Sequence, residues 1–203
     1  MKDYLLILLL GYLLGSLSPS ALLSKLKKAN LRNQGTKNLG ATNTMLILGK
    51  GYGAFVMLFD IAKAYVAVEL AIKLFPAAFY SGLISGCAAV VGHIFPFYMK
   101  FKGGKGLAAY GGMILGLDPL LFLILLAIAI AAMLITNHAI AMTVSATVLF
   151  PIFFVIRSGE LLAFLIVTGI SALILSRHTG SILEAIHGED TPVRTFIRGN
   201  KNQ

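Results

Sequence analysis

The chain has 203 residues, of which 58% are hydrophobic and 12% are charged, against roughly 25% charged in an ordinary soluble domain. The apolar residues are bunched into runs close to the ~20 residues that a helix needs to cross a bilayer, so the composition excludes a soluble fold. The net charge of +9 does not indicate nucleic-acid binding, because the basic residues lie at the ends of these runs and no soluble module presents them. Cys87 is the only cysteine, which excludes an intramolecular disulfide and the usual thiolate metal sites.

Seven apolar segments follow one another along the chain and predict an all-α integral membrane protein with about seven transmembrane helices. They cover residues 3–23, 52–74, 79–98, 106–117, 119–135, 139–156 and 160–176. The fourth segment is too short to cross the bilayer, and its glycines suit close packing against neighbouring helices. We expect residues 1–203 to form a single membrane-embedded domain.

The basic residues predict the orientation of the chain. Thirteen of the 17 lysines and arginines lie in the loop at 24–51, in the loop after the third segment, or in the C-terminal tail. Short positively charged loops stay in the cytoplasm. The pattern therefore predicts an N-terminus outside, a cytoplasmic C-terminus and an active face on the cytoplasmic side of the cell membrane.

The sharpest local motif is FKGGKG at residues 101–106, directly before the short fourth segment. Successive glycines let backbone N–H groups converge on an anion, and the start of a helix adds positive partial charge. The Walker pattern GxxxxGK[ST] is absent, so nucleotide hydrolysis is not implied. A flexible turn with cytoplasmic lysines is the alternative. The predicted phosphate cradle consists of Lys102, Gly103, Gly104, Lys105 and Gly106.

A second loop, RNQGTKNLGATN at residues 32–43, is rich in hydrogen-bond donors. Its guanidinium, ammonium, amide and hydroxyl groups suit a polyol phosphate. The alternative is a solvated loop that caps a helix near residues 45–48. The candidate binding residues of this loop are Arg32, Thr36, Lys37, Asn38 and Asn43.

A third candidate region is Arg177 and His178, where the last apolar segment ends. A histidine at a membrane interface can act as a base near neutral pH, although the pair could equally serve as a membrane anchor. The amphipathic stretch at 181–190 is predicted to be a helix that stops at Gly188. The histidines lack metal-ligand spacing, so we predict no metal site.

Charged and titratable residues also occur within the apolar segments. Asp60 and Lys63 lie three residues apart on one helix face, so each can neutralise the other inside the membrane. We expect this pair to serve helix packing. His93, in GHIFP at 92–96, is expected to orient the loop that follows it.

Together these motifs resemble the bacterial glycerol-3-phosphate acyltransferase family that uses acyl phosphate as donor, often called PlsY. The resemblance covers nearly the full length, in GSLSP (15–19), GATN (40–43), FDIAK (59–63), GHIFP with FKGGKG, and RH (177–178) with its helix ending in HGED. It implies a seven-helix membrane fold that makes lysophosphatidic acid and releases phosphate, with acyl phosphate, glycerol 3-phosphate and membrane lipids as partners. An enzyme that makes acyl phosphate is a further expected partner.

The resemblance also implies roles for the candidate residues. Acyl phosphate is already activated, so the reaction needs a positioned alcohol, a proton acceptor and charge neutralisation, and neither a metal nor a cofactor. His178 would orient or deprotonate the attacking hydroxyl, unless the substrate's own phosphate takes the proton. Lys105 and Thr36 would act beside it. The predicted phosphate and substrate ligands are Arg32, Lys37, Asn38, Asn43, Lys102, Gly103, Gly104, Gly106 and Arg177.

The chain departs from the family pattern at several polar positions. The family's first loop reads GSGN where this chain has GTKN at 35–38, and an arginine follows GATN where this chain has Leu46. An expected serine is Ile140, and an expected asparagine is Ser181. These differences leave a second hypothesis open: a catalytically weak or silent paralogue that binds acyl phosphate or phospholipid in a regulatory role. A small transporter of phosphorylated solutes is the third.

Overall fold

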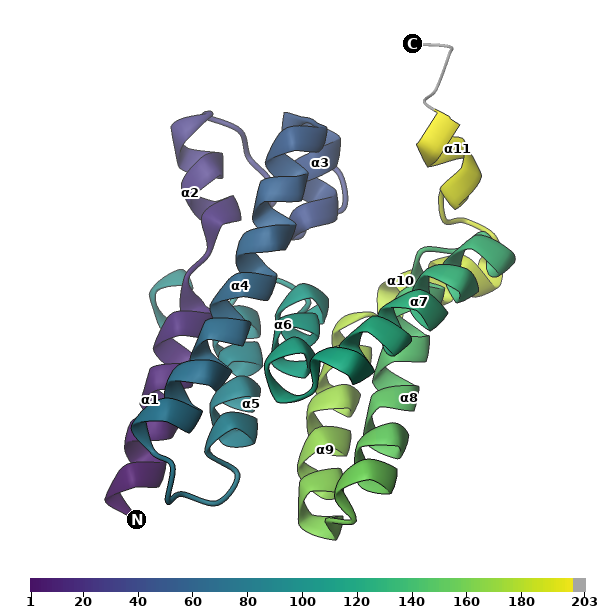
Figure 1. Ribbon diagram of the computed structural model, residues 1–203. Coiled ribbons are helices and arrows are strands. Elements are labelled where there is room, and N and C mark those ends of the chain that lie inside the picture. The colour runs from purple at the N-terminus through teal and green to yellow at the C-terminus, as the bar shows by residue number, and fades with distance from the viewer. Residues whose placement is uncertain (199–203) are drawn as a thin grey trace. The chain divides into compact units, whose positions relative to one another are not determined.

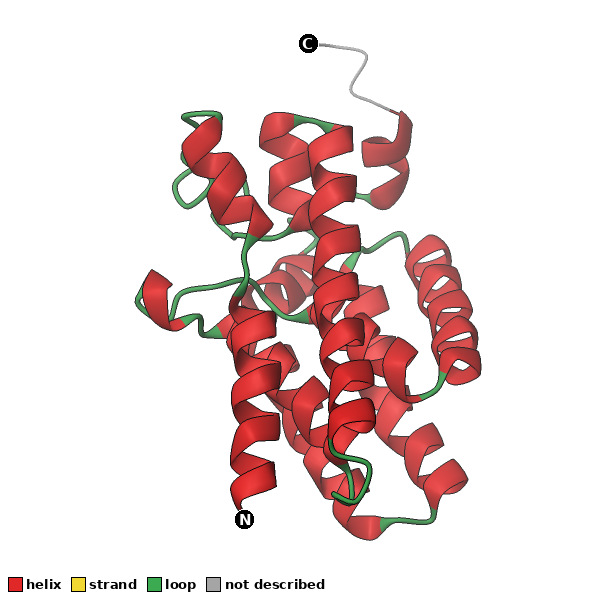
Figure 2. Ribbon diagram, turned by 60° about the vertical axis from the view of Figure 1, so that its left-hand side comes forward, coloured by secondary structure: helices red, strands yellow, loops and turns green. Residues whose placement is uncertain are grey.

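A computed structural model describes residues 1–198, and within that range the chain consists of helices joined by turns and loops, including the loop at 27–40 (Figures 1 and 2). The all-α prediction is confirmed. The helices form two compact units, Met1–Pro119 and Leu120–Gln203. The expectation of a single domain stays a prediction.

The first unit contains seven helical elements. Six are α-helices and one is a 3-10 turn at the end of the third predicted segment. Their bounds are α1 (Lys2–Ser16), α2 (Pro19–Leu26), α3 (Ala41–Leu48), α4 (Lys50–Leu74), α5 (Ser81–Ile94), η1 (Phe97–Met99) and α6 (Leu107–Leu117).

The first predicted segment, residues 3–23, is one candidate membrane span within Lys2–Leu26, but its helix is interrupted between α1 and α2. Pro19 has no N–H to donate and disfavours helical backbone in the residue before it. Ser18 is accordingly extended, and its hydroxyl accepts a hydrogen bond from the N–H of Ala21 at 3.3 Å, which caps α2. The basic loop at 24–51 therefore starts within the last turn of a separate short helix, α2.

Small residues allow the helices of the first unit to pack closely. α4 contacts α1, α5 and α6, and α1 packs along α5. A side chain at Gly15 would clash with the backbone of Ala89 on α5, and one at Gly112 would clash with the carbonyl of Ile61 on α4. Such contacts bring backbones together where apolar burial gives little drive inside a bilayer. The packing predicted for the glycines of the short helix is confirmed at Gly112.

The second unit contains α7 (Pro119–Thr136, beginning at the boundary), α8 (Ile140–Ser158), α9 (Leu161–Arg177), α10 (Thr179–His187) and α11 (Val193–Arg198). The turn between α7 and α8 holds the tail. His138 Nδ1 lies 2.9 Å from Asp190, and the N–H of Val193 donates to the carbonyl of Asn137 at 3.0 Å. The predicted helix end at Gly188 is confirmed, since Gly188 adopts φ +70° directly after α10.

Four helical stretches among residues 1–198 are long and apolar enough to cross a membrane: Lys2–Leu26, Ser81–Met99, Pro119–Thr136 and Ile140–Ser158. The pair α9 and α10, bent by 58°, would make a fifth. α4 is long but carries several charges, and α6 has 11 residues, about 16 Å at 1.5 Å per residue. The chain is a multi-pass membrane protein, while seven spans and their orientation stay predictions.

Candidate functional site

Two of the loops that the sequence singled out meet in the first unit. The Arg32 guanidinium donates from Nη2 to the backbone carbonyl of Lys102, 2.8 Å away. The loops also touch further along, because a Cβ at Gly104 would lie 3.0 Å from the carbonyl oxygen of Leu39. Loop 32–43 and FKGGKG, separated in sequence by the whole of α4 and α5, therefore form one polar surface.

Asn43 holds loop 32–43 in shape. Its side chain is 0% exposed, its Nδ2 donates to the carbonyl of Leu31 at 2.7 Å, and its Oδ1 accepts from the N–H of Thr36 at 2.8 Å. Gly35 adopts φ +57°, and any side chain there would clash with Asn43 Oδ1. Both ends of its amide are bonded to the backbone, so Asn43 has a structural role in the loop, and its binding of substrate stays a prediction.

The three residues that follow Gly35 are at least partly accessible. Thr36 and Lys37 are exposed, and Asn38 is half-buried. Lys37 has φ +56°, a left-handed conformation that costs a residue with a Cβ roughly 1–2 kcal/mol. Asn43 thus supports a short polar ridge that can face a ligand.

FKGGKG differs in one respect from the predicted phosphate cradle. The N–H of Gly103 donates to the carbonyl of Ile94 at 2.9 Å, and the N–H of Gly104 donates to that of His93 at 3.1 Å. These two amides are therefore bonded to the end of α5, and the expectation that they converge on an anion is wrong for this structure. The two glycines instead bring the loop close to α5.

The two lysines of the motif lie on either side of these glycines. Lys102 is exposed, and Lys105 is half-buried. Gly106 has φ +98° and precedes α6 directly, so its conformation requires glycine. The first N–H groups of a helix have no intrahelical partners and attract anions. Phosphate binding at the start of α6 therefore stays a prediction that the geometry of this helix end allows.

His178 and Arg177 lie in the second unit, where α9 gives way to α10. Arg177 is exposed, whereas His178 is 7% exposed. His178 Nδ1 lies 2.8 Å from the carbonyl oxygen of Ile174. Because a carbonyl can only accept, Nδ1 carries a proton, and the lone pair of the neutral ring is on Nε2.

A buried polar cluster was only partly foreseen from the sequence. The predicted Asp60–Lys63 ion pair is confirmed, with Lys63 Nζ 2.7 Å from Asp60 Oδ1. His93, on the neighbouring helix α5, joins it through Nδ1, 3.0 Å from Lys63 Nζ and 3.3 Å from Asp60 Oδ1. The i, i+3 spacing revealed the pair, but no local pattern points to a partner 30 residues away.

Three of the residues that depart from the family pattern, Leu46, Ile140 and Ser181, lie on helices. Leu46 is 48% exposed on α3, so its side chain adds little to the packing of that helix. Ile140 is the first residue of α8, and Ser181 lies in the first turns of α10. Both are half-buried. An arginine at position 46 would have room to reach outward.

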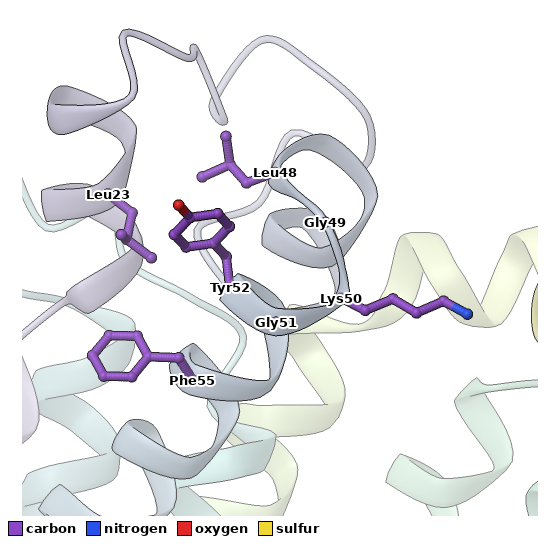
Figure 3. Close-up of a pocket in the computed structure, with 7 residues that line it drawn as sticks. All are labelled: Leu23, Leu48, Gly49, Lys50, Gly51, Tyr52 and Phe55. Atoms are coloured by element: carbon purple, nitrogen blue, oxygen red, sulfur yellow. The ribbon is translucent and has the colours of Figure 1, made fainter.

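A shallow cavity of about 570 Å³ lies in the first unit, between α2 and the junction of α3 with α4 (Figure 3). Leu23, Leu48, Tyr52 and Phe55 surround it, and Lys50 extends away. Its seven lining residues are all different from the predicted site residues. The apolar lining suits hydrocarbon rather than phosphate.

Comparison with known proteins identifies the family and the fold. A family model described as glycerol-3-phosphate acyltransferase matches residues 5–188. The glycerol-3-phosphate acyltransferases of Macrococcus caseolyticus and Aquifex aeolicus are 34% and 31% identical to the chain. The alignments cover 93% of this chain and 96% of the first relative, and 92% and 97% for the second.

Two solved structures share the fold. A crystal structure of PlsY, an integral membrane glycerol 3-phosphate acyltransferase, in its glycerol 3-phosphate form superposes with a TM-score of 0.86 at 30% identity. It covers 93% of this chain and 94% of that one. The lysophosphatidic acid form gives 0.85 at 27% identity, covering 97% and 99%. The chain belongs to the glycerol-3-phosphate acyltransferase family of integral membrane proteins.

Proposed function

We propose that the chain transfers an acyl group from acyl phosphate to the 1-hydroxyl of sn-glycerol 3-phosphate, giving lysophosphatidic acid and inorganic phosphate. Its family is that of glycerol-3-phosphate acyltransferases, and solved relatives are in forms with glycerol 3-phosphate and lysophosphatidic acid. The observation in this chain that supports the proposal best is the hydrogen bond from Arg32 to Lys102, which joins two cationic loops. No cofactor is needed, because the donor is already activated.

In this reaction the hydroxyl oxygen attacks the acyl carbonyl carbon, and the bond from that carbon to the phosphate oxygen breaks. Phosphate leaves with the bonding electrons, so negative charge grows on the carbonyl oxygen and on the leaving group. Preorganised cations and N–H donors stabilise such charge without reorganising during the reaction. Lys105 and the start of α6 after Gly106 are assigned this role, and the remaining cationic loop residues, Arg32, Lys37 and Lys102, are assigned to binding of substrate phosphate.

The acceptor must be held and deprotonated. Thr36 and Asn38 stand outward on loop 32–43, and we assign them to orienting the glycerol phosphate. His178 is assigned to accept the hydroxyl proton on Nε2, because Nδ1 is engaged with Ile174. Arg177 is assigned to phosphate. The phosphate of the acceptor remains the alternative proton acceptor.

We further propose seven helices in the membrane, with the N-terminus outside and the active face in the cytoplasm. The basic residues of both loops and of the tail support this orientation. The donor would come from a reaction that makes acyl phosphate, so a second enzyme of that class is the proposed partner.

Purified protein in detergent tests the proposal when it is given palmitoyl phosphate and glycerol 3-phosphate between about pH 6 and pH 8. We expect phosphate and lysophosphatidic acid to form. Lys105→Ala and His178→Ala should each lower the rate by ~100-fold or more, as for groups that act on transition-state charge or proton transfer. Absence of both products above a control without enzyme would refute the function, and full activity in both variants would refute the residue assignment.

A further inference from the structure

A cluster of three buried side chains, which has no role in the reaction proposed above, reaches the FKGGKG loop through His93. Asp60, Lys63 and His93 are 2%, 5% and 8% exposed. We propose that this cluster positions the phosphate-holding loop and that His93 is the residue through which it acts. The inference rests on the proposed function, because phosphate binding by this loop is part of that function.

The cluster is held from several sides. Lys63 Nζ donates to the backbone carbonyl of Leu17, just after α1, at 2.6 Å, in addition to its contacts with Asp60 and His93. The ammonium therefore links α1, α4 and α5 at one point. Both Lys63 and Asp60 approach the imidazole at Nδ1, so that edge of the ring is fixed.

The opposite edge of the ring faces the loop. A Cβ at Gly104 would clash with His93 Nε2, and the N–H of Gly104 donates to the carbonyl of the same histidine at 3.1 Å. Gly104 has no left-handed φ, so the imidazole and the nearby Leu39 carbonyl explain why glycine is needed there. Gly103 is different, because its Cβ would clash with the backbone carbonyl oxygen of His93.

Energetic considerations argue against a purely stabilising role. Taking two charges out of water costs several kcal/mol per ion, and well-packed apolar residues often replace a buried ion pair without loss of stability. Charged side chains buried in membrane helices are costly for the same reason. The cluster connects three helices to the backbone of one loop, and we explain its cost by the accurate placement of that loop. A displacement of ~1 Å at a reacting group can lower the rate 100-fold.

A comparison of two conservative variants separates positioning from folding. His93→Asn keeps a polar atom near Nδ1, within reach of Lys63, but removes the ring that contacts Gly104. We expect wild-type thermal stability with a KM for glycerol 3-phosphate raised ~10-fold or kcat lowered ~10-fold or more. Ser85→Ala is the matched control, because Ser85 donates to the carbonyl of Ala67 between the same two helices at 2.8 Å, away from the loop. It should lower the melting temperature and leave KM unchanged.

A double-mutant cycle tests the contact itself. Gly104→Ala should weaken protection by inorganic phosphate against thermal unfolding, and also raise KM, because the new methyl displaces the ring or the loop. In a His93→Ala background, Gly104→Ala should raise KM by a factor at least ~5-fold smaller than in the wild-type background, as expected for residues in direct contact. Gly103→Ala should show no such relief, because its clash is with backbone.

The outcomes distinguish this inference from the proposed function. Wild-type protein without acyl transfer would refute the function, while the phosphate-protection cycle would still report on the loop. Active wild-type protein with additive effects at positions 93 and 104, or with a His93→Asn variant of unchanged KM and kcat, would refute the positioning role.

Discussion

The guanidinium of Arg32 and the backbone carbonyl of Lys102 are 2.8 Å apart although 70 positions separate them in the sequence. Arg32 is the first residue of loop 32–43, and Lys102 is the second residue of the FKGGKG motif before α6. A planar guanidinium can hold a carbonyl with one nitrogen and keep its other N–H donors for an anion. The bond therefore fixes the two loops to each other and keeps a cation at their junction.

We expect Arg32→Ala to lower kcat/KM by about 10-fold or more, because the two loops lose their link and the junction loses its charge. Steady-state kinetics with glycerol 3-phosphate as the varied substrate gives the measurement. Arg32→Lys keeps the charge without the planar guanidinium, so its kcat/KM should lie between those of the wild type and Arg32→Ala. Lys25→Ala, an exposed basic residue near the end of α2, is the control, and equal losses in Arg32→Ala and Lys25→Ala would mean that only net charge matters.

Asn43→Ala is expected to destabilise the protein, because it leaves the Leu31 carbonyl and the Thr36 N–H without their partner. A lost buried hydrogen-bond partner costs about 1–3 kcal/mol, which thermal unfolding in detergent can detect. Asn38→Ala removes the same chemical group from a half-buried position and should leave the melting temperature unchanged while raising KM. Similar melting temperatures for both variants would contradict the structural role of Asn43.

Lys37 combines a strained backbone with a charge, and two substitutions separate these properties. Lys37→Gly removes both, so the melting temperature should rise or hold while KM for glycerol 3-phosphate increases. Lys37→Ala keeps the left-handed backbone and removes only the charge, so it should raise KM equally with no gain in stability. If KM stays at the wild-type value in both variants, the ammonium does not contact substrate phosphate.

Leu46→Arg should raise the rate of acyl transfer, because the family pattern has an arginine there and the side chain of Leu46 is 48% exposed. The change therefore removes little packing and adds a cation beside the polar loop. Leu46→Gln, of similar length and no charge, controls for polarity alone. A rate unchanged in the arginine variant, with normal binding of glycerol 3-phosphate, would indicate that Lys37 already supplies this charge.

Much of the fold follows from the sequence, because apolar run length and helix-breaking residues act locally. The structure confirms the short helix that ends at Leu117, the helix near residues 45–48 and the end of α10 at Gly188. The break before Pro19 was missed because hydrophobicity continues across it, whereas the backbones of Leu17 and Ser18 both leave the helical conformation. A hydropathy pattern reports the membrane environment better than it reports where a helix ends.

The candidate site shows where sequence reasoning stops. Residue type and spacing indicated the loops and the Asp60–Lys63 pair, which are local features. Whether Asn43 faces a ligand or its own backbone depends on how the loop closes, and the bonding of Gly103 and Gly104 to α5 depends on a close approach between segments. The same motif that reads as an anion cradle can hold a loop against a helix, and only coordinates separate these two uses of its N–H groups.

The yield of lysophosphatidic acid per phosphate released, measured with purified protein, palmitoyl phosphate and glycerol 3-phosphate, tests the central claim most directly. Acyl transfer predicts that the two products appear in equal amounts and that phosphate release depends on the acceptor. Phosphate release at the same rate without glycerol 3-phosphate, or release with no lysophosphatidic acid, would contradict the assignment of these loops to acyl transfer.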